Sequence, residues 1–312
     1  MPRRSLAALP VVLAAALVVA SLVALATAPT ARAQPAPDPF AGIAHLDGEA
    51  LRQALHGVLQ GSHRRLSWDA TKQVIIAADR AALPLDPPHI LDIYSNTVLL
   101  GEAPGRDAWD REHVWPSSLM GWPAADEDDR CNIPYTDAHL LFAAASAYNQ
   151  SRSNLWFDDV DAATCAEAGD CEKPVAGSPA PNRRLEPAWE VWPGRRGDVA
   201  RALLYVDVRY AGGIVAGGCE EHDLVLTDTL AAVVTATTRV TTAHMGRLST
   251  LLRWHLEDPV GPQDRQHNDA VAARQANRNP FTDRPELVCR VWSVGVCETW
   301  RPRVWLPWAE RP

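Results

Sequence analysis

The sequence has almost no lysine, no CxxC spacing, no internal repeat and no linker that would divide it. Only Lys72 and Lys173 are lysines among 30 basic residues, and this arginine bias reflects codon composition more than function. The missing CxxC spacing argues against a structural zinc site. Because neither a repeat nor a linker is found, we interpret residues 34–312 as one domain.

Long apolar runs are also absent after residue 30, so no later segment is expected to span a membrane. The one such run, residues 5–30, follows two arginines and ends at the small-x-small pattern of residues 31–33. This layout predicts a secretory signal peptide over residues 1–33. An uncleaved membrane anchor is the alternative, because the run could cross a bilayer. Cleavage is favoured, which predicts an extracellular or periplasmic protein without stable membrane association.

Positive charge is scarce as well. The formal net charge of −8 becomes −11 when the three arginines of the signal are removed, because the signal contains no acidic residue. Such a charge is unfavourable for binding phosphate polyanions over the whole surface. A nucleic-acid site would therefore need a local basic patch or a bound cation.

Six cysteines lie in the part that is expected to be exported. An even number in an oxidising compartment predicts disulfides, although the sequence alone leaves their pairing open. Short separations favour Cys165–Cys171 and Cys289–Cys297, which leaves Cys131–Cys219 as a long-range bridge.

Apolar spacing predicts an α+β fold that is mostly helical, with few strands and those early in the chain. The expected strands are residues 89–95 and 111–115, and residues 158–196 are expected to form a surface loop. The expected helices are one capped by Asp47 and others over residues 68–79, 136–152, 197–210, 229–240, 245–258 and 264–278.

Four short motifs carry residues that are suited to phosphodiester chemistry: REHVWP (111–116), DAHLL (137–141), NQSRSN (149–154) and RNPF (278–281). Each has an ordinary explanation when taken alone. His113 could be a hydrogen-bonded structural histidine, Glu112 a solvated acid, and Asn149 a residue that ends a helix.

In this order and spacing the motifs resemble the bacterial endonuclease I family, exported nucleases with a ββα-metal (His-Me finger) core. The family pattern is an R-E-H-V-x-P strand, a D-x-H-x-L segment and N-x-x-R-x-N. The likeness continues through residues 196–210, 251–260 and 277–281, and so covers about 90–292. It implies a mostly helical single domain around a small ββα-metal nuclease core.

The resemblance implies a role for each matching residue. His113 is expected to be the general base that activates water, and Glu112 and Asn149 the ligands of one divalent cation. Mg²⁺ is expected, with Mn²⁺ or Ca²⁺ as alternatives. The residue types suit these roles, because Mg²⁺ prefers hard oxygen ligands while keeping several waters. A histidine with an ordinary pKa of about 6.5 can be neutral at working pH.

Four further residues match the pattern less directly. Arg152 and Arg130 are candidates for phosphate contact, Arg130 by a looser match, while Asp137 and His139 are expected to support the site or to pack. Where the family often has a polar residue and a proline after the histidine of D-x-H, this chain has LLFAAA. The acidic loop 126–129 is interpreted as solvated, with a calcium site as the alternative; folded over the site, it would weaken polyanion binding.

The adjacency of Glu112 and His113 suits in-line displacement. Neighbouring side chains of a strand point to opposite faces, and the attacking and leaving oxygens lie on opposite sides of phosphorus. The resemblance implies a largely sequence-non-specific endonuclease acting on DNA and/or RNA, and we expect it to be a monomer. The alternatives are an extracellular ribonuclease of the same fold and a non-catalytic exported nucleic-acid-binding protein.

Overall fold

The computed structural model describes residues 38–43, 45–82, 87–101, 109–126, 129–215 and 217–298. The predicted signal peptide, 1–33, lies outside these ranges, as does part of the acidic loop. Within the described part of the chain, no helix combines the length and the apolar character needed to cross a bilayer.

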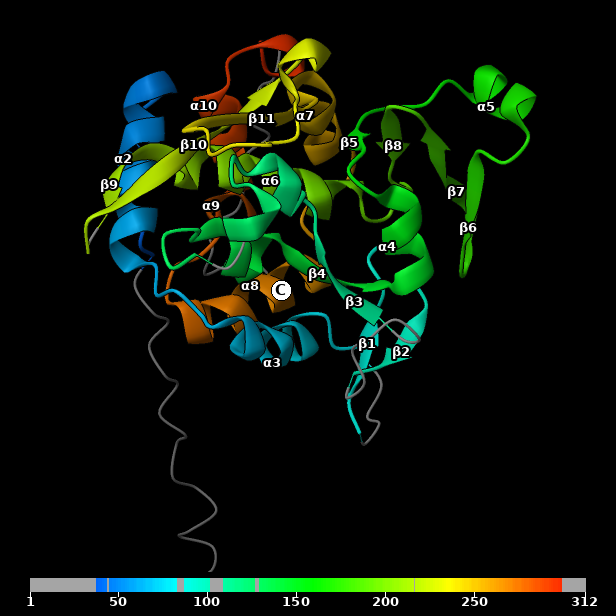
Figure 1. The fold of residues 1–312 in the computed structure, drawn as a ribbon, viewed down its shortest axis with the longest axis horizontal. Helices are drawn as coiled ribbons and strands as arrows, with labels where there is room; N and C mark the ends of the chain where they lie inside the picture. Colours follow the sequence, from blue (N-terminus) through cyan, green and yellow to red (C-terminus); the bar gives the residue numbers. More distant parts are fainter. Residues whose placement is uncertain are drawn as a thin grey trace, which may run out of the picture. The chain divides into compact units, whose positions relative to one another are not determined.

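Several helices pack around a central one (Figure 1). The central helix α6 is buried along almost its whole length, and it packs against α2, α7 and α9, while α3 packs on α8. A helix that is enclosed on all sides needs no polar face. The helices are α2 (Gly48–Ser62), α3 (Trp68–Ala78), α4 (Ser146–Arg152), α5 (Ala162–Ala168), α6 (Arg196–Arg209), α7 (Leu248–Glu257), α8 (Pro262–Gln275), α9 (Pro280–Asp283) and α10 (Val288–Val291).

The strands form four small sheets, with orders β1-β2, β3-β4, β11-β10-β9 and β5-β8-β7-β6. Neighbouring strands are antiparallel except in the pairs β10–β11 and β5–β8, which are parallel. The strands are β1 (His89–Leu91), β2 (Val98–Leu100), β3 (Trp109–His113), β4 (Leu141–Ala145), β5 (Trp156–Phe157), β6 (Glu172–Val175), β7 (Ser178–Leu185), β8 (Ala188–Glu190), β9 (Ala211–Val215), β10 (Cys219–Thr227) and β11 (Thr242–Gly246).

The mixed α+β class is confirmed, and so are the helices predicted from the clearest apolar spacing, now α2, α3, α6, α7 and α8. Asp47 does precede α2, but its side chain makes no capping hydrogen bond to that helix. It accepts one from Arg290 Nε instead, at 2.7 Å. The strand prediction was wrong in extent, because strands continue through the second half of the chain.

Three segments differ from the sequence-based expectation. Residues 136–152 are not one helix, because Leu141–Ala145 forms β4 and pairs with β3, which overrides the helix propensity of alanine. Residues 158–196 are not a loop but contain α5 and β6 to β8. Residues 229–240 contain only the short 3-10 turn Leu230–Ala232, in a stretch rich in β-branched residues that disfavour helices.

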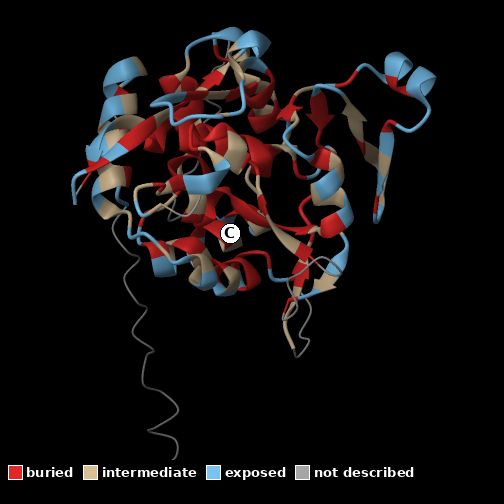
Figure 2. Cartoon of the chain, in the orientation of Figure 1, coloured by how far each residue is buried: buried red, intermediate tan, exposed pale blue. Residues whose placement is uncertain are grey.

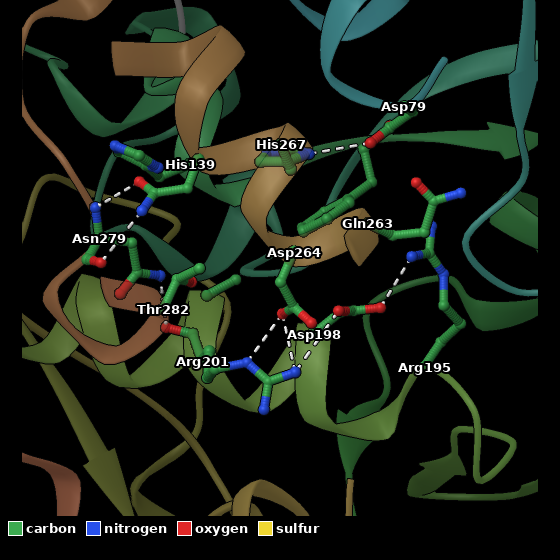
Figure 3. Close-up of a pocket in the computed structure, with 13 residues that line it drawn as sticks. Asp79, His139, Arg195, Asp198, Arg201, Gln263, Asp264, His267, Asn279 and Thr282 are labelled. Atoms are coloured by element: carbon green, nitrogen blue, oxygen red, sulfur yellow. Dashed lines mark hydrogen bonds and ion pairs between the residues drawn. The ribbon is translucent and has the colours of Figure 1, made fainter. Parts of the chain in front are cut away.

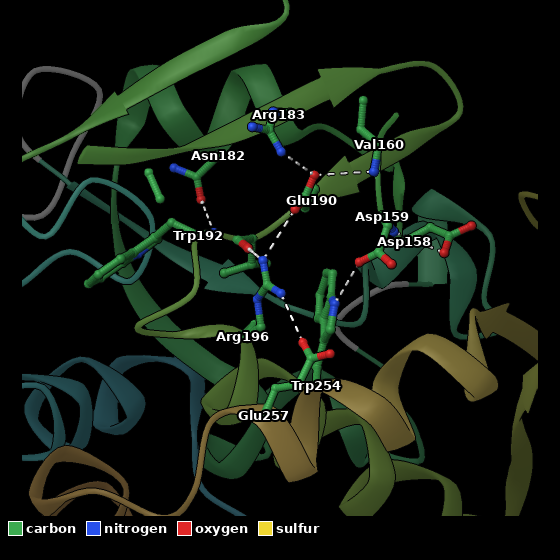
Figure 4. A network of polar contacts seen from close by, with 12 residues as sticks. Asp158, Asp159, Val160, Asn182, Arg183, Glu190, Trp192, Arg196, Trp254 and Glu257 are labelled. Atoms are coloured by element: carbon green, nitrogen blue, oxygen red, sulfur yellow. Dashed lines mark hydrogen bonds and ion pairs between the residues drawn. The ribbon is translucent and has the colours of Figure 1, made fainter. Parts of the chain in front are cut away.

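An ionic network around the buried Glu190 joins the four-stranded sheet to the helices (Figure 4). Glu190, at the end of β8, accepts hydrogen bonds from Arg183, Arg196 and the backbone N–H of Val160, each at 3.2 Å. Arg196 also donates to Glu257 of α7, at 3.0 Å. The network thus anchors β7 and β8 to α6 and α7, while α5 and β6 stay mostly exposed (Figure 2).

Three disulfides link cysteines in the described part of the chain: Cys131–Cys219, Cys165–Cys171 and Cys289–Cys297. The pairing predicted from sequence separation is confirmed. Cys131–Cys219 ties the segment that leads to the second motif onto the first residue of β10.

Candidate active site

Strands β3 and β4 and helix α4 form a ββα unit that brings together the first and third motifs (Figure 1). The antiparallel register pairs Glu112 with Phe142 and His113 with Leu141. Helix α4 begins directly after β4 and packs beside β3, which places Asn149 and Arg152 next to that strand. Pairing with β4 therefore determines which face of β3 meets the helix.

The side chains of β3 alternate between two environments, as a strand requires. Asp110 and Glu112 face α4, where they contact Asn149 and Arg152. Arg111 and His113 instead contact Trp68, the first residue of α3. The adjacent acid and histidine thus lie against different elements of the fold.

Two side-chain contacts connect β3 to α4. Asn149 Nδ2 donates to Asp110 Oδ2 at 3.2 Å, and Arg152 Nη1 lies 3.2 Å from Glu112 Oε1. Residues three apart on a helix lie on one side of it, as do residues two apart on a strand. Tyr94 adds a hydrogen bond from its hydroxyl to Glu112 Oε1, at 2.6 Å.

Several carboxyl groups lie close together at this face of β3. Burial raises the pKa of Glu112, while the guanidinium of Arg152 and the hydrogen bond from Tyr94 oppose that effect. The carboxylates of Asp92 and Asp110 also lie close enough to raise it. Together with Glu112, they place three carboxyl groups around one guanidinium, and such a set of oxygen atoms would suit one divalent cation.

The donor set also fits a hard cation. A carboxylate can only accept hydrogen bonds, so the amide nitrogen of Asn149 must face Asp110, which leaves its oxygen for another partner. Glu112 supplies carboxylate oxygens, and Mg²⁺ is typically held by few protein oxygens while keeping waters. Among the described residues, no three His, Cys, Asp or Glu side chains form a metal-binding group. The candidate ligands at β3 are of a different kind, because they combine one carboxylate with one amide.

His113 is held in a single tautomer. Its Nε2 lies 2.9 Å from the carbonyl oxygen of Tyr135, which can only accept, so Nε2 carries the proton and Nδ1 is the acceptor. The ring stacks on Trp68, at 5.6 Å between centroids and 2° between planes, and on Tyr135 at 5.1 Å. Desolvation lowers the pKa of His113 to about 4, so the ring is neutral at pH 7.

The two candidate phosphate contacts lie in different surroundings. Arg152 is buried, and it donates to the carbonyl oxygens of His113, at 3.1 Å, and of Val114. These contacts hold the end of β3 in the interior. Arg130 is exposed, with Nη1 3.7 Å from Cys219 Sγ, and Arg65 donates to its carbonyl oxygen at 2.6 Å. Of the two, Arg130 is the one that reaches solvent.

Comparison with known proteins assigns the chain to a family. A sequence model of the Endonuclease I family matches residues 49–286, a range that contains all four motifs. The chain belongs to the endonuclease I family. It is therefore a nuclease, an enzyme that hydrolyses nucleic acid, as the motifs had indicated.

Two relatives of this nuclease are named extracellular ribonucleases. The protein from Bacillus amyloliquefaciens is 33% identical over 248 residues, which cover 78% of this chain and 74% of the relative. The protein from Bacillus subtilis (strain 168) is 30% identical over 248 residues, covering 78% and 75%.

The DAHLL motif of the nuclease lies in a second, fully buried polar cluster. Asp137 accepts hydrogen bonds from Tyr205 and Tyr210, both at 2.8 Å, and from Gln275 at 2.6 Å. Burial alone would raise the pKa of Asp137, but the neighbouring His63 and His139 and the hydrogen bond from Gln275 lower it to about 2. His139 Nε2 donates to a backbone carbonyl at 3.1 Å. Both residues thus link the turn before β4 to α6 and to the end of α8.

A small cavity lined mostly by polar residues adjoins His139 (Figure 3). Its polar groups contact one another: His267 lies 2.8 Å from Asp79, and Arg201 pairs with Asp264 at 2.7 Å. Asp79 also accepts from the backbone N–H of Ala143 in β4, at 2.6 Å. The cluster therefore fixes β4 against α3, α6 and α8.

The sequence analysis missed four residues of the site of this nuclease. Asp110 could have been found, because it precedes Glu112 by two positions in the same strand and so shares its face. Tyr94, Trp68 and Tyr135 gave no local signal, because they reach Glu112 and His113 only through the tertiary fold.

Proposed function

We propose that this nuclease is a secreted, divalent-metal-dependent endonuclease that cleaves RNA and DNA with little sequence preference. The observation that carries the proposal is the difference between the surroundings of the two faces of β3. His113 presents an acceptor nitrogen on one side, and Glu112 and Asn149 present oxygens on the other. Such a division suits in-line attack on phosphorus.

His113 acts as the general base. Its Nε2 is committed to the Tyr135 carbonyl, so the lone pair of Nδ1 is the one that can take a proton from water. Stacking on Trp68 keeps the ring in one orientation. The lowered pKa keeps this nitrogen unprotonated at neutral pH.

Glu112 and Asn149 hold one Mg²⁺. When bound, the cation stabilises negative charge on the scissile phosphate and on the leaving oxygen. Arg152 and Tyr94 both engage Oε1 of Glu112 and so keep its carboxylate in place. Arg130, exposed at the surface, contacts a substrate phosphate, while Arg152 supports the strand from inside.

Water as the nucleophile makes the substrate 2′-hydroxyl unnecessary, so this chemistry accepts both RNA and DNA. The names of the two relatives favour RNA as one substrate. A ribonuclease of the same fold with a preference for RNA is the second candidate. Export is supported by the signal-like N-terminus, by three disulfides and by the word extracellular in both names.

The deciding experiment incubates the disulfide-bonded protein with supercoiled plasmid and with structured RNA, in Mg²⁺ or in EDTA. We expect nicking followed by degradation, abolished by EDTA and by Glu112→Gln. His113→Ala should lower the rate by at least ~10²-fold, the usual scale for a lost general base. The ratio of RNA to DNA cleavage measures substrate preference.

His89→Ala is a matched control, because His89 is also a partly exposed strand histidine that contacts a backbone carbonyl oxygen, at 2.9 Å. Its activity should stay near that of the wild type. RNA cleavage that EDTA leaves unchanged would exclude the metal-dependent mechanism. Binding of nucleic acid by the folded protein without any cleavage would point to the non-catalytic alternative.

A further inference from the structure

Asp110 lies beside the proposed metal ligands, yet no motif includes it. It precedes Glu112 by two residues in β3, so both side chains face α4. Its Oδ2 accepts a hydrogen bond from Asn149 Nδ2, at 3.2 Å. One helical turn further along α4, Arg152 pairs with Glu112. Each carboxylate of this face thus engages one residue of the helix.

The two contacts have different consequences for the chemistry. Arg152 compensates the charge of Glu112, whereas the amide of Asn149 is neutral and compensates nothing. What Asp110 gains in this contact is small, since a hydrogen bond to an amide replaces one to water. The effect on Asn149 is larger, because an amide has two unlike ends and only its oxygen can bind a cation.

We propose that Asp110 is a positioning residue that orients the Asn149 amide, with its nitrogen toward β3 and its oxygen toward the cation. This inference rests on the proposed function, which makes Asn149 a metal ligand. Without the acceptor at position 110, the amide could rotate and present its N–H groups to the site. The site would then lose one of its two protein ligands for part of the time.

The test measures Mg²⁺ binding by titration calorimetry without nucleic acid, for the wild type, Asp110→Ala and Asp110→Asn. Groups that orient metal ligands typically contribute 10- to 100-fold in affinity. We expect Asp110→Ala to raise the Kd for Mg²⁺ by about that factor. Asp110→Asn should raise it clearly less, because its amide oxygen still accepts from Asn149 Nδ2.

Asp269→Ala provides the control, since Asp269 is an exposed carboxylate that pairs with Arg278 away from β3. Its Kd for Mg²⁺ should not change. Thermal unfolding in EDTA reports any damage to the fold. Should Asp110→Ala prove unstable, Asp110→Val removes the same acceptor with a residue that suits a strand.

Two results would overturn the inference. An unchanged Kd in Asp110→Ala would mean that the amide needs no anchor, and equal losses in Asp110→Ala and Asp110→Asn would mean that the charge matters and the orientation does not. The variant Glu112→Gln distinguishes these two results from a failure of the proposed function. If Glu112→Gln binds Mg²⁺ as the wild type does, the metal site itself is wrong.

Discussion

The hydroxyl of Tyr94 lies 2.6 Å from Oε1 of Glu112, and both side chains are buried. Tyr94 is held by Asp92, whose carboxylate accepts from the backbone N–H groups of Tyr94, at 2.7 Å, and of Ala145, at 3.0 Å. The turn after β1 therefore joins the end of β4 to the acid of β3. In this way Glu112 is oriented by a segment outside the ββα unit.

Tyr94→Phe should weaken the metal site while preserving the fold. Removing the hydroxyl leaves a buried carboxylate oxygen with one partner fewer, which costs roughly 1–3 kcal/mol in unfolding free energy. Loss of an orienting group typically lowers metal affinity or activity by about 10–100-fold. Activity measured against Mg²⁺ concentration should therefore rise at higher Mg²⁺ than in the wild type. Identical titration curves would contradict this role of Tyr94.

Arg152→Met should destabilise the protein strongly. The substitution leaves the carboxylate of Glu112 buried without the guanidinium that pairs with it. It also removes the donor to the carbonyl oxygen of His113. Breaking a buried ion pair from one side costs about 3–5 kcal/mol. Urea unfolding checks this value. Arg290→Met is the control, because the ion-pair partner of Arg290 is the exposed Asp47, and such a pair contributes about 0–1 kcal/mol. Equal effects of the two substitutions would refute the assignment.

Two helical glycines should respond to alanine in opposite directions. A Cβ on Gly197, in α6, would lie 2.1 Å from the backbone oxygen of Asp258, whereas one on Gly57, in α2, would meet nothing within 4 Å. Gly197→Ala should lower the unfolding free energy by about 1–3 kcal/mol through overpacking. Gly57→Ala should raise it by about 0.5–1 kcal/mol, because alanine favours helix. Thermal denaturation of both variants measures the sign of each change.

Stability should fall as the pH drops below 6.5. Burial lowers the pKa of His63 and His139 from 6.5 to about 4, and that of His255 to about 3. At a pH between the lowered pKa of the folded state and the value of 6.5 in the unfolded state, the unfolded chain binds protons that the folded chain does not. The stability that these neutral histidines contribute to the folded state is fully present above pH 6.5 and is lost as the pH falls toward 4. Urea midpoints at pH 7.5, 5.5 and 4.5 should decrease in that order, and a constant midpoint would exclude the effect.

Sequence reasoning succeeded where the signal is local. Helix α3 was predicted almost to its ends, because the spacing of its apolar residues is a property of the segment itself. It failed for β4, where an alanine-rich stretch has high helix propensity yet becomes a strand. Pairing with β3 and the hydrogen bond from Ala143 to Asp79 decide that outcome, and neither is visible in the segment alone.

For this protein, the sequence by itself favoured the disulfide pairing that the fold adopts, and it determined the family and the opposite facing of Glu112 and His113. The last follows from the two-residue repeat of a strand, which requires no knowledge of the fold. Only the tertiary structure decided what each side chain meets: Arg152 and Tyr94 at Glu112, and Tyr135 and Trp68 at His113. These partners come from distant segments, and burial brings them together because a buried polar group needs a hydrogen-bonding partner.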